Sequence, residues 1–392
     1  MRLPTVRAHV GVITCAALFA AVAGAPFPSV PDRGPREGIV LSAADPTPST
    51  SPSVSPPPSA EPEPRRFTLV MGGDLLWHDT VWLSAAAEGR AGAPYDFDPM
   101  FADVRPLIAG ADVALCHEEV PFASPGQALQ SYPVFAAPPE VAPWIASMGW
   151  DGCTTASNHA LDQGYDGLVR TADLLEQNGV AHIGTFRTAA ERRQPVILDA
   201  NGVRVGVVAG TYGLNGFPLP EGREWSVSML DVDDLLRQAR TAREAGAEVV
   251  VVHIHAGYEY SSTPSPEQVA AVEALTASPY VDLVLGEHAH VVQPITRVNG
   301  KWVVYGMGNL VAQQEVTRPA TYRGILVDFT FVERPDGTFR VGRAAYVPVG
   351  WNNIGTGPIR VRRLDDPGDQ AARAAVIADV NGLGRTPGLH VG

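Results

Sequence analysis

Five polar clusters in this sequence carry side chains that can bind a metal ion or move a proton. Each cluster follows a short apolar run, and together they contain carboxylates, an Asn-His pair and several further histidines. Mixed oxygen and nitrogen ligands of this kind suit one or two divalent transition metals that activate water. The candidate residues are Asp74, Glu119, Asn158, His159, Asp162, His255, His288 and His290.

Two of the clusters supply carboxylates. Gly72 and Gly73 let the backbone turn after the apolar run 67–71, so that Asp74 can be presented as a hard oxygen ligand. Glu118 and Glu119 follow the run 113–116, and in an extended segment they point to opposite sides, so both are not expected to reach one site. Taken singly, a helix cap and a solvated acidic turn explain the same residues.

The third cluster places an amide beside an imidazole. The Asn158 side-chain oxygen can bind a metal while His159 faces the substrate as a proton donor, and Asp162 can orient that imidazole. Helix capping by these polar residues is the structural alternative.

The last two clusters are rich in histidine. His255 stands at the end of an apolar strand pattern, and His253 shares its face either as a ligand or as a buried neighbour. In extended geometry, His288 and His290 direct both imidazoles to one side, a common way to bind a divalent metal. Accessory residues, which could instead pack in the core or form turns, are His78, His253, Glu259 and Asn309.

The segments between the clusters predict an α/β domain, in which ligands bind at the carboxyl ends of parallel strands. Strands 325–331 and 339–347 have no helix between them and indicate a second, partly antiparallel sheet. Other strands are expected near 67–71, 113–116, 203–209, 249–254, 281–285 and 302–305, and helices near 139–148, 167–178, 232–245 and 265–276.

Composition and the N-terminal residues indicate where the protein acts. The formal net charge of -13 argues against nucleic acid as the main partner. Two arginines, an apolar run and Ala23-Gly24-Ala25 predict a signal peptide or signal anchor over 1–25, and hence an extracytoplasmic protein, either secreted or anchored to the membrane. Residues 26–66 are rich in Pro and Ser and predict a disordered linker.

Two cysteines, Cys116 and Cys153, remain after such a leader. An exported protein can pair them in a disulfide. Two small buried thiols on strands are the alternative.

The clusters and their order resemble the CapA family, which is associated with bacterial capsule synthesis and poly-gamma-glutamate production and is similar to calcineurin-like metallophosphoesterases. The resemblance covers about residues 67–313. It implies a four-layer α/β/β/α sandwich, with the domain over 67–350 and a C-terminal tail over 351–392. The motifs are Gly73-Asp74, Glu119, Ala156-Ser157-Asn158-His159-Ala160-Leu161-Asp162, His255-Ala256-Gly257-Tyr258-Glu259-Tyr260, Gly286-Glu287-His288-Ala289-His290 and Tyr305-Gly306-Met307-Gly308-Asn309.

The sequence departs from the family pattern at several positions. His117-Glu118-Glu119 stands where many relatives have Asn-Leu-Glu, and Ala256 replaces a common Trp. Glu287 stands where a further His is frequent. The first motif lacks the Asp-x-His form of the wider phosphoesterases, which leaves one metal position short of a ligand unless His78 or Glu259 supplies it.

Two hypotheses follow for function. In the first, the chain is an exported metal-dependent phosphoesterase-like hydrolase linked to capsule or poly-gamma-glutamate synthesis. It would use one or two Mn, Zn or Fe ions, with His159 and Asp162 in catalysis and a phosphoester or anionic polymer as substrate. In the second, it is a non-catalytic polymer-binding subunit of a membrane synthesis and export complex. The proposed metal ligands are Asp74, Glu119, Asn158, His255, His288 and His290.

Overall fold

Strand β1 (Arg66–Leu75) lies in the middle of the larger of two sheets in the computed structural model, which describes residues 63–352 and 356–392. Its side chains alternate, so that Leu69 and Met71 face the second sheet while Val70 faces a layer of helices. Both faces of the strand are therefore buried, as expected for parallel strands that are covered on both sides.

The larger sheet has nine strands within the described residues, in the order β14-β13-β12-β1-β2-β3-β4, with β11 beside β1 and β15 beside β13. Strands β1 to β4 are parallel, whereas β12 runs antiparallel to β1 and β13 antiparallel to β12. The remaining bounds are β2 (Val113–Glu118), β3 (Gly152–Thr154), β4 (Ala181–Ile183), β11 (Asn309–Val311), β12 (Arg323–Glu333), β13 (Phe339–Gly350), β14 (Arg362–Arg363) and β15 (Leu389–Val391).

The smaller sheet has six strands within the described residues, in the order β5-β6-β7-β8-β10-β9. Its four central strands are parallel, and β5 and β9 are antiparallel edges. The bounds are β5 (Val196–Ala200), β6 (Val203–Thr211), β7 (Val249–His255), β8 (Leu283–Glu287), β9 (Ile295–Val298) and β10 (Lys301–Val304).

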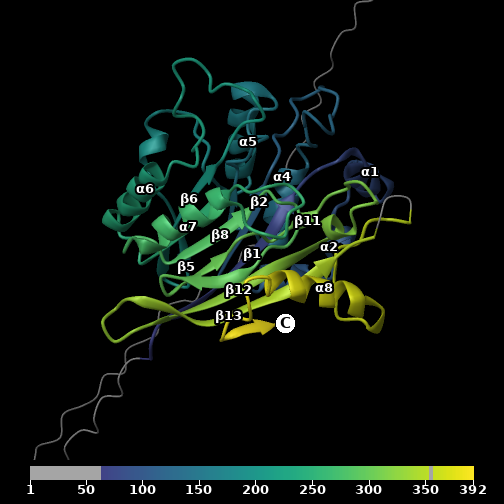
Figure 1. The fold of residues 1–392 in the computed structure, drawn as a ribbon. Helices are drawn as coiled ribbons and strands as arrows, with labels where there is room; N and C mark the ends of the chain where they lie inside the picture. Colours follow the sequence, from purple (N-terminus) through teal and green to yellow (C-terminus); the bar gives the residue numbers. More distant parts are fainter. Residues whose placement is uncertain (1–62, 353–355) are drawn as a thin grey trace, which may run out of the picture. The chain divides into compact units, whose positions relative to one another are not determined.

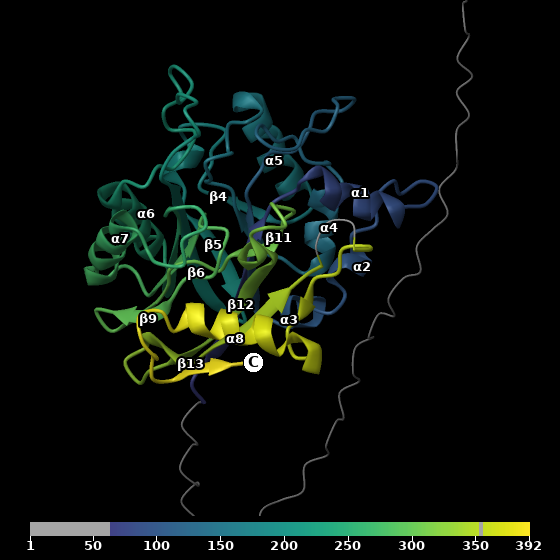
Figure 2. The ribbon, with the colours of Figure 1, turned by 45° about the vertical axis from the view of Figure 1, so that its right-hand side comes forward.

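Helices cover the outer face of each sheet. Both views place α6 and α7 on one side of the sheets and α1, α2 and α4 on the other (Figures 1 and 2). The helix bounds are α1 (Asp79–Ala87), α2 (Asp98–Phe101), α3 (Arg105–Ala109), α4 (Val141–Met148), α5 (Gly164–Gln177), α6 (Val232–Glu244), α7 (Pro266–Ala277) and α8 (Gln370–Val380).

Among the described residues, three hydrophobic cores fill the spaces between these layers. One lies between the two sheets and includes Met71, Val251 and Leu285. A second lies between the larger sheet and its helices, and a third between the smaller sheet and α6 and α7. Three cores between four layers confirm the predicted α/β/β/α sandwich.

The division between the sheets differs from the prediction. Strands β12 and β13 do not form the second sheet, because β12 pairs with β1 along its length and the ring of Phe331 stacks on Phe67 with centroids 4.8 Å apart. The smaller sheet is formed instead by β5 to β10, and the chain then returns to the larger sheet with β11 to β15. Local periodicity predicts a strand but not its partner.

The C-terminal segment, expected as a tail over 351–392, joins the same domain in the structure. Strands β14 and β15 both pair with β13, and Val376 and Val380 of α8 contribute to the core between the sheets. Apolar residues spaced along α8 give this segment its own buried face.

Two predictions concern the N-terminal residues and the cysteines. No helix among residues 63–352 and 356–392 has the length and apolar character needed to cross a membrane. The predicted signal peptide or anchor over 1–25 and most of the predicted linker, 26–62, lie outside the described residues. Cys116 and Cys153 are neighbours in the pairing of β2 with β3 and form a disulfide, so the first of the two alternatives holds.

Candidate metal centre

The carboxyl ends of strands from both sheets meet at one place. Asp74 lies opposite His117 in the pairing of β1 with β2, and His255 lies opposite Glu287 in the pairing of β7 with β8. Because these strands are parallel within each sheet, their last residues gather at one edge, as the predicted clusters required.

Asp74 was expected in a turn after the first strand, but it lies within β1. The strand continues because Gly73 passes close to the backbone of Gly308, where an added Cβ would lie only 1.8 Å from the carbonyl oxygen. The Asp74 amide then donates to that oxygen at 3.0 Å. Glycine at 73 therefore fixes the carboxylate against a second segment instead of forming a turn.

His288 and His290 also differ from the prediction, which assumed extended backbone. Their φ angles are 99° and 56°, so both lie in the left-handed region that non-glycine residues rarely adopt. Such conformations cost about 1–3 kcal/mol each and often mark functional sites. The two imidazole centroids are 6.0 Å apart, and both rings face the same centre.

The centre contains three fully buried carboxylates, those of Asp74, Glu119 and Glu287. Asp74 Oδ1 and both side-chain oxygens of Glu119 and of Glu287 have no hydrogen-bond partner among the described residues. Burial, followed by the charge of Asp74, raises the pKa of both glutamates well above the ordinary value. Ionised carboxylates without partners are costly to bury, so this donor set fits divalent cations.

Glu118 turns away from this centre, as the alternation along an extended segment predicts. Its Oε2 accepts a hydrogen bond from Trp77 Nε1 at 2.9 Å. Burial raises its pKa well above the ordinary value. Only Glu119 of the acidic pair reaches the candidate site.

His290 carries the positive charge of the centre. Its Nδ1 lies 3.1 Å from Asp74 Oδ2 and 3.0 Å from Asn309 Oδ1, and its Nε2 lies 3.9 Å from Glu119 Oε1. Burial alone lowers its pKa, but the carboxylates of Glu119 and Asp74 raise it to about 9. A metal bound by this imidazole must therefore displace a proton.

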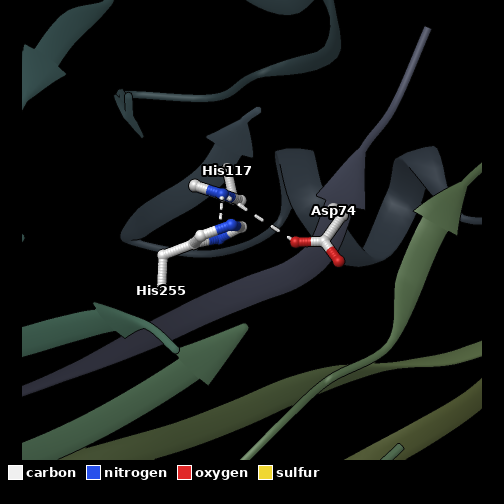
Figure 3. Close-up of side chains that lie close together, drawn as sticks. All are labelled: Asp74, His117 and His255. Atoms are coloured by element: carbon white, nitrogen blue, oxygen red, sulfur yellow. Dashed lines mark hydrogen bonds and ion pairs between the residues drawn. The ribbon is translucent and has the colours of Figure 1, made fainter. Parts of the chain in front are cut away.

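At three other histidines of the centre, burial favours the neutral form of the imidazole. Burial lowers the pKa of His117 and His288 to about 3, and it lowers the pKa of His255 well below the ordinary value. His255 Nε2 lies 2.8 Å from Asn158 Oδ1 and 3.8 Å from Glu119 Oε1. Figure 3 shows His117 between Asp74 and His255, with its ring directed toward both.

Possible ligand atoms form overlapping groups here. Among the described residues, four groups have ligand atoms that all lie within 4.8 Å of one another, and three of these groups belong to this centre. Asp74 is common to two of the three groups, and so is His290. The groups are Asp74, His117 and His255; Asp74, Glu119 and His290; and Glu259, His288 and His290. Together they outline one continuous centre with room for more than one ligand set.

His159 stands beside this centre on the wall of a cavity. Its Nδ1 lies 2.7 Å from Asp162 Oδ2, which also accepts from the backbone amide of Phe135 at 2.7 Å. The cavity has a volume of about 300 Å³, and His159 and His290 both line it. Asp162 is thus placed to orient an imidazole that a substrate can reach.

Residues 68–314 match the family described as bacterial capsule synthesis protein PGA_cap. This match covers more than half of the chain. The chain belongs to this family.

Curated relatives of this PGA_cap chain include three bacterial proteins. The capsule biosynthesis protein CapA of Bacillus anthracis is 25% identical over 65% of this chain and 62% of the relative. The PGA biosynthesis protein CapA of Bacillus subtilis is 26% identical over 50% and 51%. A Mycobacterium tuberculosis protein named a probable polyglutamine synthesis accessory protein is 25% identical over 60% and 65%. The matches thus span about half to two thirds of these relatives.

Solved structures show a weaker likeness. A calcineurin-like phosphoesterase from Bacillus subtilis has a TM-score of 0.43 at 16% identity, covering 73% of this chain and 90% of that one. An NAD nucleotidase from Haemophilus influenzae has a TM-score of 0.41 at 10% identity, covering 84% and 57%.

The accessory residues of this PGA_cap chain take different positions. His78 Nδ1 accepts from the Gln313 amide at 3.2 Å, and burial lowers its pKa to about 4. His253 is buried against His117, with ring centroids 4.8 Å apart, and neither of its ring nitrogens has a hydrogen-bond partner among the described residues. Glu259 is exposed beside His288 and His290, and Asn309 contacts His290.

Two residues of the centre were absent from the predicted set, His117 and Glu287. Both are fully buried beside Asp74. Both are also positions where the sequence departs from the family motifs. A departure to a metal-binding residue type inside a motif was therefore the signal that could have identified them.

Proposed function

We propose that this chain is an exported, metal-dependent hydrolase of phosphoester type that acts in capsule or poly-gamma-glutamate synthesis. The family and the buried cluster of carboxylates and imidazoles support the proposal. One or two divalent ions, Mn, Zn or Fe, would be held by Asp74, Glu119, Asn158, His255, His288 and His290.

One observation carries the proposal. Five carboxylate oxygens from Asp74, Glu119 and Glu287 are buried together and have no hydrogen-bond partner within the described part of the chain. Removing such a charge from water costs several kcal/mol or more, so nothing in packing alone explains why three of them converge. A bound divalent ion would neutralise them and would supply Lewis acidity and an activated water.

The protein's own residues supply the remaining chemistry. Asp162 Oδ2 holds the Nδ1–H of His159, which leaves His159 Nε2 toward the 300 Å³ cavity. When protonated, that nitrogen donates to the departing oxygen of a phosphoester. Tyr260 and Glu259 line the same cavity.

Hydrolysis and metal content test this proposal together. The purified chain is stripped with a chelator, reloaded with Mn²⁺, Zn²⁺ or Fe²⁺, and assayed with bis-p-nitrophenyl phosphate and p-nitrophenyl phosphate. We expect hydrolysis only in reloaded protein, with metal content measured by elemental analysis. A wild-type chain that binds metal yet turns over neither substrate faster than its His159→Ala variant contradicts the catalytic role.

An extracytoplasmic location, secreted or anchored by the N-terminal segment, is part of this proposal. The leader-like residues 1–25 support it, and so does the disulfide between Cys116 and Cys153, since disulfides persist in oxidising compartments. Mass spectrometry of the N-terminus after cell fractionation tests the location. A peptide that begins near residue 26 indicates cleavage, and an intact leader in the membrane fraction indicates an anchor.

A second candidate function is that of a non-catalytic subunit that binds an anionic polymer. A groove of about 410 Å³ at the other edge of the sheets supports it. Its only lining carboxylate is that of Asp282, which pairs with Arg243 outside the groove. The lining cations are Arg297, Lys301, Arg334 and Arg340.

Polymer binding separates the two candidates. Purified chain is titrated with poly-gamma-glutamate, and the same preparation is assayed for phosphoester hydrolysis. Binding without hydrolysis under any of the three metals favours the subunit, whereas hydrolysis that requires His159 favours the enzyme.

A further inference from the structure

A line of hydrogen bonds runs behind the candidate metal ligands, beginning at Thr154. His117 Nδ1 lies 3.1 Å from the carbonyl oxygen of Thr154 and 2.8 Å from its hydroxyl oxygen. A carbonyl oxygen can only accept, so His117 Nδ1 carries the hydrogen. The hydroxyl of Thr154 itself donates to the carbonyl of Cys116 at 3.4 Å, which leaves its oxygen free to accept as well.

The next step fixes the tautomer of His255. With its proton on Nδ1, a neutral His117 has an acceptor at Nε2, and this atom lies 2.9 Å from His255 Nδ1. His255 therefore donates from Nδ1 and keeps a lone pair at Nε2. Both rings are buried, so water does not offer an alternative partner.

A second line approaches the same point from the other side. Asn158 Nδ2 donates to Asn215 Oδ1 at 3.0 Å, which turns the side-chain oxygen of Asn158 toward His255. Asn158 Oδ1 and His255 Nε2 are 2.8 Å apart. Each of these atoms presents a lone pair, and no hydrogen remains to lie between them.

Two facing lone pairs repel each other unless a cation lies beside both. Glu119 Oε1 lies 3.8 Å from His255 Nε2, has no hydrogen-bond partner among the described residues, and adds a third electron-rich atom at the same point. The two lines of hydrogen bonds end at His255 Nε2 and Asn158 Oδ1, and together they direct both lone pairs toward one position that suits a cation.

We propose that His117 and Asn215 are positioning residues, which fix the tautomer of His255 and the amide of Asn158 so that both lone pairs face one divalent ion. This inference rests on the proposed metal centre but does not require hydrolysis. It also gives a role to His117, which stands where many relatives have Asn. Partners that orient metal-binding histidines in this way raise metal affinity about 10–100-fold.

His117 is not itself assigned as a metal ligand. Its Nε2 is 3.9 Å from Asp74 Oδ1, but the single lone pair of that nitrogen already accepts from His255. A direct ligand and a positioning residue give different results in a metal titration, because only loss of the latter can be repaired by another hydrogen-bond acceptor.

The first experiment is calorimetric titration of the metal-stripped full chain with Zn²⁺ and Mn²⁺. We expect His117→Leu to lower the affinity for one of the bound metal ions about 10–100-fold. His117→Gln should restore much of that affinity, because its amide oxygen can accept a hydrogen bond from His255 Nδ1. His253→Leu is the matched control, since His253 is buried like His117 and contacts its ring but has no hydrogen-bonded ring nitrogen among the described residues. It should bind like wild type.

The second variant avoids the core. Asn215 is exposed and has a φ of 50°, so Asn215→Gly keeps its backbone conformation while removing the side chain. We expect a several-fold weaker affinity for the same metal ion. This variant keeps the inference testable if His117→Leu does not fold.

Ring-nitrogen NMR of the zinc-loaded chain reads the tautomer directly. We expect His255 to carry its proton on Nδ1 in wild type and in His117→Gln, and to lose that single tautomer in His117→Leu.

If His117→Leu and Asn215→Gly both bind metal with the affinity of wild type, the inference is wrong. It is also wrong if His117→Leu loses a whole metal equivalent without recovery in His117→Gln, since that result makes His117 a direct ligand. If wild type binds no metal at all, the proposed metal centre fails, whereas normal metal binding without hydrolysis overturns only the catalytic proposal.

Discussion

The two edges of the sheets differ in how their charges are arranged. At the carboxyl edge of β1 and β8, Asp74 and Glu287 are buried, and three of their four side-chain oxygens have no hydrogen-bond partner among the described residues. At the opposite edge, Arg334 and Arg340 line an open groove, close to where β12 pairs with the start of β1. A buried carboxylate without hydrogen bonds is stabilised by a bound cation or proton. An exposed arginine is stabilised by water and can still attract an anion.

This contrast assigns different chemistry to the two edges. Under the proposed function, the carboxyl edge is a metal centre, in which removing a ligand should change both stability and activity. The opposite edge is a solvated cationic surface, in which removing a charge should change only association with an anion. The predictions below test this division.

The largest effect is expected from His290→Ala. His290 contacts Asp74, Asn309 and Glu119, so its loss removes one proposed ligand and the imidazole whose pKa these carboxylates raise. Metal content should fall by at least one equivalent, and hydrolysis should fall to the level of stripped protein. Elemental analysis and the phosphoester assay measure both. Full metal content in this variant would break the assignment of the carboxyl edge.

The second effect is expected from His159→Ala. Loss of a general acid lowers kcat about 10²–10⁴-fold. Metal content should stay unchanged, because the ring hydrogen-bonds Asp162 and faces the cavity. Asp162→Asn should lower kcat less, since the imidazole remains. A parallel loss of metal in His159→Ala would show that the residue is a ligand instead.

The third effect is a loss of stability with rising pH in the metal-free chain. The pKa of His290 is raised to about 9, so its contribution is full below about 6.5 and is lost as pH rises through 9. The shift corresponds to about 3 kcal/mol, or about 5–10 °C in melting temperature. The raised pKa values of Glu119 and Glu287 act in the same direction.

Thermal melts between pH 7 and pH 9, with chelator or with saturating metal, check this prediction. The melting temperature should fall with pH in chelator and stay nearly constant with metal, because the ion replaces the proton. Equal slopes in both conditions would mean that the carboxyl edge binds no ion.

The smallest effect on activity is expected at the opposite edge. Arg334→Ala combined with Arg340→Ala should leave metal content and kcat for a small phosphoester within about twofold, because changes at exposed residues are usually small. Binding of poly-gamma-glutamate should weaken and become less sensitive to salt, since exposed charges are screened. Arg240→Ala, an exposed arginine on α6, is the matched control. Unchanged polymer binding in the double variant would remove the support for the groove.

Much of the fold followed from local sequence patterns. Val249 to His255 forms a strand because a run of β-branched residues suits a strand buried on both faces, and α6 begins at an Asp231 cap. The short strands β4 and β11 were not predicted, since three residues carry too little periodicity. Their positions come from pairing with longer neighbours.

The candidate site was predicted in part for a similar reason. Residue types after the strand ends predicted that Asp74, Asn158 and His255 gather at one place. In the structure, His255 lies 2.8 Å from Asn158 and belongs to one group of possible ligands with Asp74. The prediction could not distinguish the roles of His253 and His255, because alternation along the strand places both on one face. Only the approach of β2 puts His117 against both rings.

By itself, the sequence determined which chemical groups this protein has and which strand ends carry them, because side-chain type and period-two alternation are local properties. The tertiary structure decided which groups share a proton or face a common ion. His117 and His255 are 138 positions apart, yet their ring nitrogens lie 2.9 Å apart. Such distances depend on the packing of two sheets across one core, which no local pattern encodes.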